Sequence, residues 1–207
     1  MRILAFVDTH GSEKHLKHII DASHNADILV CAGDFTIFEN DVESILRKLN
    51  SIGKPVLIIH GNHETSATIV AFSANLPNIH FIHKTYFLTN DLIFFGYGGG
   101  GFGEIDSKFD IVTEQLMKDF KDLEKKNKKE YRFVLVTHAP PYGTTLDDLG
   151  YHVGSKSIMK FIENEQPLIT ICGHIHECSG KQDKIKNTLA INPGPGGKII
   201  EIEKQTI

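Results

Sequence analysis

The sequence has no long hydrophobic run, little cysteine and no excess of basic residues. No apolar stretch approaches the roughly 20 residues that a helix needs to cross a bilayer, and the first run, 1–7, is too short for a secretory signal. The cysteines, Cys31, Cys172 and Cys178, are three in number and form no Cys-x-x-Cys pair. Neither a disulfide scaffold nor a thiolate metal site is therefore indicated. We expect a cytoplasmic protein with no membrane partner.

The charge balance is slightly acidic. Lysine and arginine number 22 against 26 aspartates and glutamates, a formal net charge of -4. Stable binding to nucleic acid is not expected, because that binding depends on a surplus of positive charge. The rest of the composition is ordinary for a globular protein, with 41% hydrophobic and 23% charged residues. Without an internal repeat or a low-complexity linker, we expect one domain over residues 1–207.

Short aliphatic and β-branched runs alternate with amphipathic segments, which is typical of an α/β fold with buried, mostly parallel strands. Strands are predicted at 3–7, 28–31, 56–60, 81–82, 92–96, 133–137, 168–172, 188–191 and 198–202. Helices are predicted near 13–24, 41–49 and 110–129. In the last of these, Val112, Leu116, Phe120 and Leu123 share one face. The second half of the chain is expected to contain less helix than the first.

Side chains that can bind metal ions follow nearly every strong apolar run. They are Asp8, His10, Asp34, Asn62, His138, His174 and His176. In a parallel sheet the carboxyl ends of the strands share one edge, and ligands bind there. Each residue alone has a structural explanation as a cap, a turn residue or a core histidine. Their joint placement at successive strand ends indicates one cluster instead.

Two ligand pairs, Asp8 with His10 and His174 with His176, are spaced i and i+2. On an extended segment such residues point the same way, so both members of each pair are expected to face the cluster. Imidazole and oxygen ligands without thiolate suit Mn, Fe, Zn, Co or Ni. If Asp34 bridges two ions, only two carboxylates oppose two dications, and the remaining positive charge suits phosphate.

With these residues in view, the chain resembles the calcineurin-like metallophosphoesterase superfamily, especially its short prokaryotic, archaeal-type members. The five motifs of that superfamily stand in order as Asp8-Thr9-His10, Gly33-Asp34, Gly61-Asn62-His63-Glu64, His138 and Gly173-His174-Ile175-His176. The resemblance implies an α/β fold of two facing mixed β-sheets flanked by helices, a four-layer sandwich. It also implies two divalent metal ions, with Mn expected first and Fe, Zn, Ni or Co as alternatives.

The resemblance also implies a role for each motif residue. One metal is assigned to Asp8, His10, Asp34 and His176. The second is assigned to Asp34, Asn62, His138 and His174. His63 is implied as the catalytic histidine, and the implied reaction is hydrolysis of a phosphoester by a hydroxide that bridges the ions. Phosphoprotein phosphatases extend the second motif to Gly-Asp-x-x-Asp-Arg-Gly, whereas Phe-Thr-Ile-Phe follows Asp34 here, so the residue that orients His63 stays open.

The expected substrate is a small-molecule or nucleotide phosphoester, with phosphomonoesterase and phosphodiesterase activity both open. A nuclease is an alternative, as is a catalytically silent protein-binding scaffold of the same fold. The presence of His63 and of every ligand favours the enzyme. Outside the motifs, Tyr97, Phe102, Tyr142 and His152 are candidate substrate-pocket residues, and the glycine-rich segment 98–103 is either a phosphate-approaching loop or a plain connection. The motifs leave the oligomeric state open.

Overall fold

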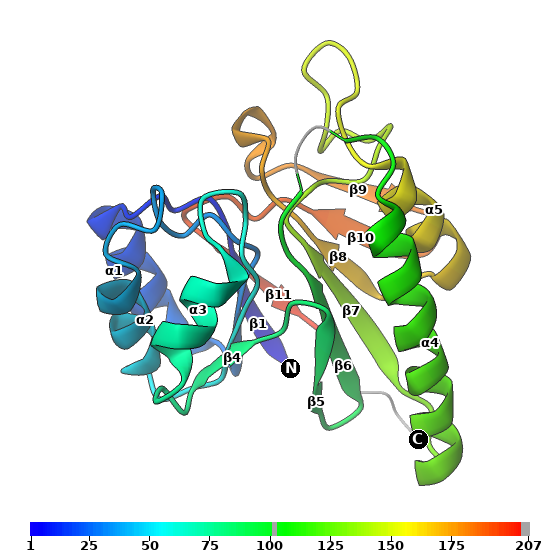
Figure 1. Cartoon of the computed structure of the whole chain (residues 1–207), viewed down its shortest axis with the longest axis horizontal. Coiled ribbons are helices and arrows are strands. Elements are labelled where there is room, and N and C mark those ends of the chain that lie inside the picture. Colours follow the sequence, from blue (N-terminus) through cyan, green and yellow to red (C-terminus); the bar gives the residue numbers. More distant parts are fainter. Residues whose placement is uncertain (101–102, 204–207) are drawn as a thin grey trace.

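The protein is described by a computed structural model that covers residues 1–100 and 103–203. Within these residues the strands form two sheets, one of five strands and one of six. The sheets face each other, and helices cover the outer face of each (Figure 1). The order of layers is therefore helix, sheet, sheet, helix. This confirms the predicted fold of two facing mixed sheets flanked by helices.

The first sheet has the strand order β11-β1-β2-β3-β4. The strands are β11 (Lys198–Glu201), β1 (Arg2–Phe6), β2 (Ile28–Cys31), β3 (Val56–Ile58) and β4 (Ile79–Phe81). The strands β1 to β4 run parallel, and β11 pairs antiparallel with β1 at one edge. Its outer face is covered by α1 (Glu13–Ala22), α2 (Val42–Asn50) and α3 (Ser66–Ser73) (Figure 1).

The second sheet has the strand order β5-β6-β7-β8-β10-β9. The strands are β5 (Thr85–Thr89), β6 (Leu92–Tyr97), β7 (Arg132–Thr137), β8 (Ile169–Ile171), β10 (Thr188–Ile191) and β9 (Gln182–Ile185). The central strands run parallel, and the two edge strands β5 and β9 are antiparallel to their neighbours. Its outer face carries α4 (Ser107–Asn127) and α5 (Lys156–Glu165) (Figure 1). Short 3-10 turns are formed by η1 (Ser23–Asn25) and η2 (His176–Cys178).

The main core lies between the two sheets. Ala5 and Val30 from the first sheet share one buried cluster with Phe94 and Val136 from the second. Two further clusters fill the spaces between each sheet and its helices. The central strands are thus buried on both faces. This explains why their sequences are continuous apolar runs rather than alternating apolar and polar residues. Across residues 1–100 and 103–203, no helix is both long and apolar enough to cross a membrane.

The helix expected at 110–129 is α4, and its predicted apolar face packs against the core of the second sheet. The expectation of less helix in the second half is wrong, because α5 was missed. A signal for α5 was present: the Ser155 side chain caps the N–H of Ile158, and Ile158, Phe161 and Ile162 recur at helical spacing and are buried. The helix α3 and the edge strands β5 and β9 were also missed. Edge strands bury few side chains, and β9 buries only Ile185, so they leave no apolar run to detect.

Candidate metal centre

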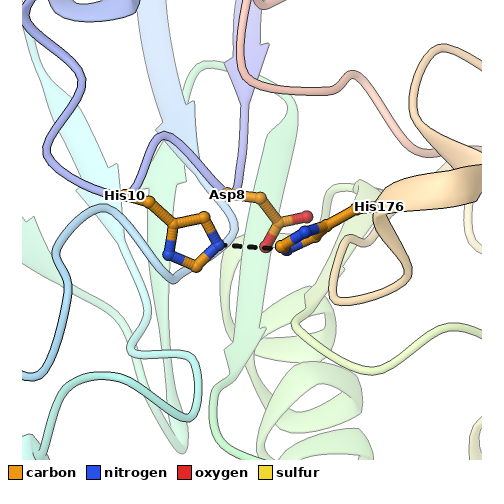
Figure 2. Close-up of side chains that lie close together, drawn as sticks. All are labelled: Asp8, His10 and His176. Carbon is orange, nitrogen blue, oxygen red and sulfur yellow. Dashed lines mark hydrogen bonds between the residues drawn. The ribbon is translucent and has the colours of Figure 1, made fainter.

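One half of the predicted cluster joins the end of β1 to the segment after β8. Donor atoms of Asp8, His10 and His176 all lie within 4.8 Å of one another, and Figure 2 shows the three side chains converging. The Nε2 atoms of His10 and His176 are 3.0 Å apart. Two nitrogens bound to one ion at roughly 2.0–2.1 Å stand about 3 Å apart. The donor set and its spacing therefore fit a metal ion at this position.

The other half joins the ends of β2, β3, β7 and β8. Donor atoms of Asp34, His138 and His174 lie within 4.8 Å of one another. The Oδ1 atom of Asn62 lies 2.9 Å from His174 Nδ1 and 3.1 Å from His138 Nε2. Asp34 also belongs to a group with His10 and His63, so its carboxylate lies between the two halves. All seven predicted ligands are therefore brought together at one edge of the fold.

The backbone at the ligands differs from the extended form expected for the two i, i+2 pairs. Asp8 and His10 have φ values of 54° and 45°, and Asp34 and His174 have 49° and 71°. The expectation of an extended segment is wrong, because the chain turns in the left-handed region immediately after each strand. Such residues cost on the order of 1–3 kcal/mol each. Their concentration at one cluster indicates that the surrounding structure imposes them to aim the side chains.

Two motif glycines permit the close approach of the loops that carry Asp34 and Asn62. A Cβ atom added at Gly61 would overlap the carboxylate of Asp34. A Cβ atom at Gly33, where φ is 98°, would lie 2.6 Å from the backbone nitrogen of Gly61 and 2.9 Å from His138 Nδ1. Any larger residue at either position would push the ligands apart, which explains the glycine before each ligand in physical terms.

Glu64 ties these loops together beneath the ligands, a role that was not predicted from the sequence. Its side chain is buried, with the residue 4% exposed. One carboxylate oxygen accepts the N–H groups of Asp34 and Gly61 at 3.1 and 3.0 Å. The other accepts the N–H and hydroxyl of Thr36, both at 2.8 Å. Burial raises the pKa of Glu64, although these donors oppose that shift. The acidic residue that closes the third motif was the available signal.

Replacing Glu64 by alanine is expected to lower the free energy of unfolding by about 3 kcal/mol or more, because each buried donor left unpaired costs roughly 1–3 kcal/mol. Chemical denaturation followed by circular dichroism measures this loss. Glu163→Ala is the control, because Glu163 is exposed on α5, and exposed substitutions usually change stability by less than about 0.5 kcal/mol. Equal stability of the two variants would contradict the bracing role of Glu64.

Hydrogen bonds from the backbone distinguish the histidines of the cluster. The Nδ1 atoms of His10 and His138 lie 3.2 and 2.9 Å from the carbonyl oxygens of Thr36 and Ala32. A carbonyl only accepts, so each Nδ1 carries a proton, and when either ring is neutral its lone pair is on Nε2, where a metal can bind. At His63 the direction of the hydrogen bond at Nδ1 is reversed, because the Phe38 N–H donates to it at 3.3 Å. Neutral His63 therefore carries its proton on Nε2, 4.0 Å from Asp34 Oδ2, where it is available as a hydrogen-bond donor.

The two carboxylates of the cluster have different proton affinities. Burial raises the pKa of Asp8 to about 6. Burial also acts to raise the pKa of Asp34, but the hydrogen bond and charge of His138 outweigh it and hold that pKa at about 2. Burial lowers the pKa of His138, and its bond to Asp34, with 3.3 Å between Nε2 and Oδ2, more than reverses this. Asp34 is thus an anion throughout the neutral pH range at the centre of the cluster.

The candidate pocket residues have different environments. Tyr97 is buried, and its hydroxyl donates to Asp106 at 3.0 Å. Tyr142 and His152 lie together, with ring centroids 5.6 Å apart, and His152 Nδ1 is 2.9 Å from the buried carboxylate of Asp147. Phe102 lies outside the described residues. The role of all four in substrate binding stays a prediction.

The fold and the histidine–aspartate cluster together define an α/β sandwich with a candidate metal site, and comparison with known proteins identifies its family. The sequence model of the family described as calcineurin-like phosphoesterase matches residues 1–178. This protein belongs to that family, which comprises metal-dependent phosphoesterases. It is also 35% identical over 203 residues to an uncharacterized protein of Methanocaldococcus jannaschii, a match that covers 94% of this chain and 88% of the relative.

Solved structures share the fold at low sequence identity. A protein of Thermus thermophilus superposes with a TM-score of 0.75 at 18% identity, covering 94% of this chain and 90% of that one. A dimetal phosphatase from Danio rerio superposes with a TM-score of 0.64 at 12% identity, covering 92% and 86%. These likenesses confirm the four-layer arrangement over nearly the whole chain.

Proposed function

We propose that this protein hydrolyses phosphoesters with the help of two divalent metal ions, of which Mn²⁺ is the first candidate. Asp8, His10, Asp34 and His176 would hold one ion. Asp34, Asn62, His138 and His174 would hold the other. The observation that carries the proposal is the spacing of the donor atoms, since neighbouring donors in both halves stand about 3 Å apart, as ligands of one ion do.

The residues of this chain prepare the site for an anionic substrate. When bound, two divalent ions polarise phosphoryl oxygens and lower the pKa of water toward neutrality. Asp8 and Asp34 are the only carboxylates among the seven proposed ligands, and Asn62 contributes an oxygen without a charge. The filled site would keep a surplus of positive charge, which favours a phosphate group and the charge that develops during hydrolysis.

His63 is proposed to bind the phosphoryl group through its Nε2–H. Its Nδ1 already accepts the N–H of Phe38, so an imidazolium ring would place two hydrogens against each other at that position. This disfavours proton donation by His63 to the leaving group, which would start from the doubly protonated ring. A fixed donor that stabilises charge on a phosphoryl oxygen is consistent with the observed bond.

The direct test is hydrolysis of p-nitrophenyl phosphate and bis-p-nitrophenyl phosphate with Mn²⁺, Ni²⁺, Co²⁺, Zn²⁺ and Mg²⁺ in turn. We expect turnover with at least one ion and its loss after chelation. Preference for one ester identifies a monoesterase or a diesterase, and cleavage of a single-stranded oligonucleotide would identify the nuclease alternative. A metal-loaded protein that cleaves none of these substrates would contradict the proposal and favour a protein-binding scaffold.

A further inference from the structure

Phe38 is an aromatic residue held in solvent beside the proposed catalytic histidine. It is 75% exposed, although a large apolar side chain gains free energy from burial. Its ring centroid lies 4.6 Å from that of His63, and the His63 ring lies 4.8 Å from that of His10. The three rings therefore form a row that runs from the metal cluster to solvent, and Phe38 is the outermost of them.

The backbone of Phe38 is strained, and the segment of His63 maintains the strain. Phe38 and Glu39 have φ values of 47° and 64°, a region that bulky residues rarely occupy. The Glu39 N–H donates to the His63 carbonyl at 3.1 Å, and Glu39 Oε1 accepts the N–H of Thr65 at 2.8 Å. With the bond from the Phe38 N–H to His63, these contacts tie the turn to the segment 63–65. Strain of this kind persists where the surroundings impose it, and it concentrates at functional sites.

We propose that Phe38 is a stacking platform for a flat aromatic ring in the leaving group of the substrate, as found in nucleotides and aryl phosphates. The proposal rests on the proposed function, because it takes the phosphoryl group to lie at the metal cluster. From there the ester group would extend past His63 and meet the exposed face of Phe38. The half-exposed side chain of Ile37 adds apolar surface beside it. An aromatic face stacks with any nucleobase or aryl ring, since each has a π face.

The first test compares substrates that share the phosphate and differ in the ring. Phe38→Ala removes the platform but keeps the backbone N–H that binds His63. We expect it to lower kcat/KM for adenosine 5'-monophosphate and phenyl phosphate by roughly 5- to 150-fold, the range of stacking one base on an aromatic side chain. For ribose 5-phosphate and glycerol phosphate the expected change is less than about twofold. For each substrate, kcat/KM of the variant is divided by kcat/KM of the parent protein. Differences in leaving-group reactivity between the substrates then cancel.

Ile111→Ala is the matched control, because Ile111 is also strongly exposed, at 69%, but lies on α4 at the outer face of the second sheet. It should leave all four substrates unchanged. A loss for only one of the two aromatic esters would show whether the ring is a nucleobase or an aryl group. An equal loss for all substrates would overturn the platform and make Phe38 a positioning residue for His63. No loss for any substrate would also overturn it.

The second test measures binding without turnover. The sequence contains no tryptophan, so Phe38→Trp places a single fluorescent indole ring at this position. Adenosine 5'-monophosphate is expected to quench this emission, and ribose 5-phosphate at the same concentration is not. Equal responses to both ligands, or none to either, would overturn the platform. Absence of hydrolysis of every ester tested, the diester bis-p-nitrophenyl phosphate included, would instead refute the proposed function, and the fluorescence measurement would then test the platform on its own.

Discussion

Replacing Asp34 by asparagine is expected to weaken binding of both metal ions by more than 100-fold and to abolish most turnover. The carboxylate lies between the two groups of ligands, and with a pKa of about 2 it is ionised at neutral pH. Asparagine keeps the shape but removes the only charge that both proposed ions would share. Changes in the residues that merely support metal ligands already reduce affinity by about 10- to 100-fold, so removing a shared ligand should have a larger effect.

Titration calorimetry with Mn²⁺ and metal analysis after dialysis measure the effect of Asp34→Asn. Asp21→Asn is the control for loss of one negative charge, because Asp21 is exposed on α1. Circular dichroism establishes that the variant is folded. A folded Asp34→Asn protein that retains two tightly bound ions would rule out a bridging carboxylate. Loss of one ion only would assign Asp34 to a single half of the cluster.

Replacing His63 by alanine is expected to leave metal binding intact and to reduce kcat by roughly 10²- to 10³-fold, the usual cost of removing one fixed donor to a developing oxyanion. Metal content is expected to stay unchanged, because His63 is not among the proposed ligands and its neutral ring carries the proton on Nε2. Steady-state kinetics at saturating metal, together with metal analysis, test both parts. His18→Ala is the control, since His18 is an exposed histidine on α1.

Leaving groups of different basicity separate the two chemical roles open to His63. If it donates only a hydrogen bond to a phosphoryl oxygen, the loss in His63→Ala should be similar for p-nitrophenyl and alkyl esters. A proton donor would instead produce a much larger loss with the alkyl ester, whose oxygen needs the proton most. That second result would show that the Phe38 amide does not control the protonation of His63. Unchanged kinetics in a metal-loaded variant would remove His63 from the reaction altogether.

Much of the fold was predictable from sequence because strands buried on two faces leave a strong apolar signal. The central strands β1, β2, β6 and β7 and the amphipathic face of α4 were predicted close to their observed positions. The weak predictions share one physical cause. An edge strand such as β9 or a short helix such as α3 buries few side chains, with Ile69 alone buried in α3. The position of such an element therefore depends on packing against segments that are distant in the chain.

The backbone conformation of the ligands was also beyond sequence reasoning. The spacing of Asp8 and His10 predicted an extended segment, whereas both residues occupy the left-handed region. Side-chain periodicity reports a regular strand, but it carries no information about a turn that follows the strand. The N–H groups of Asp8 and His10 donate to the carbonyl oxygens of Gly33 and Asp34 at 3.2 and 3.1 Å, and Glu64 with the glycines at 33 and 61 holds the loops of Asp34 and Asn62 close together. Those contacts join segments about 30 residues apart.

By itself, the sequence determined the kinds of donor atom, their order along the chain and their positions after the strands, since these follow from residue identity and apolar pattern. Only the tertiary structure decided which ring nitrogen of the histidines carries a proton and which has the lone pair. Backbone groups at Ala32, Thr36 and Phe38 set which nitrogen of His138, His10 and His63 carries the proton. Every residue has such groups, so residue identity does not reveal which of them will meet a given histidine. That pairing arises only when loops from different strands come together.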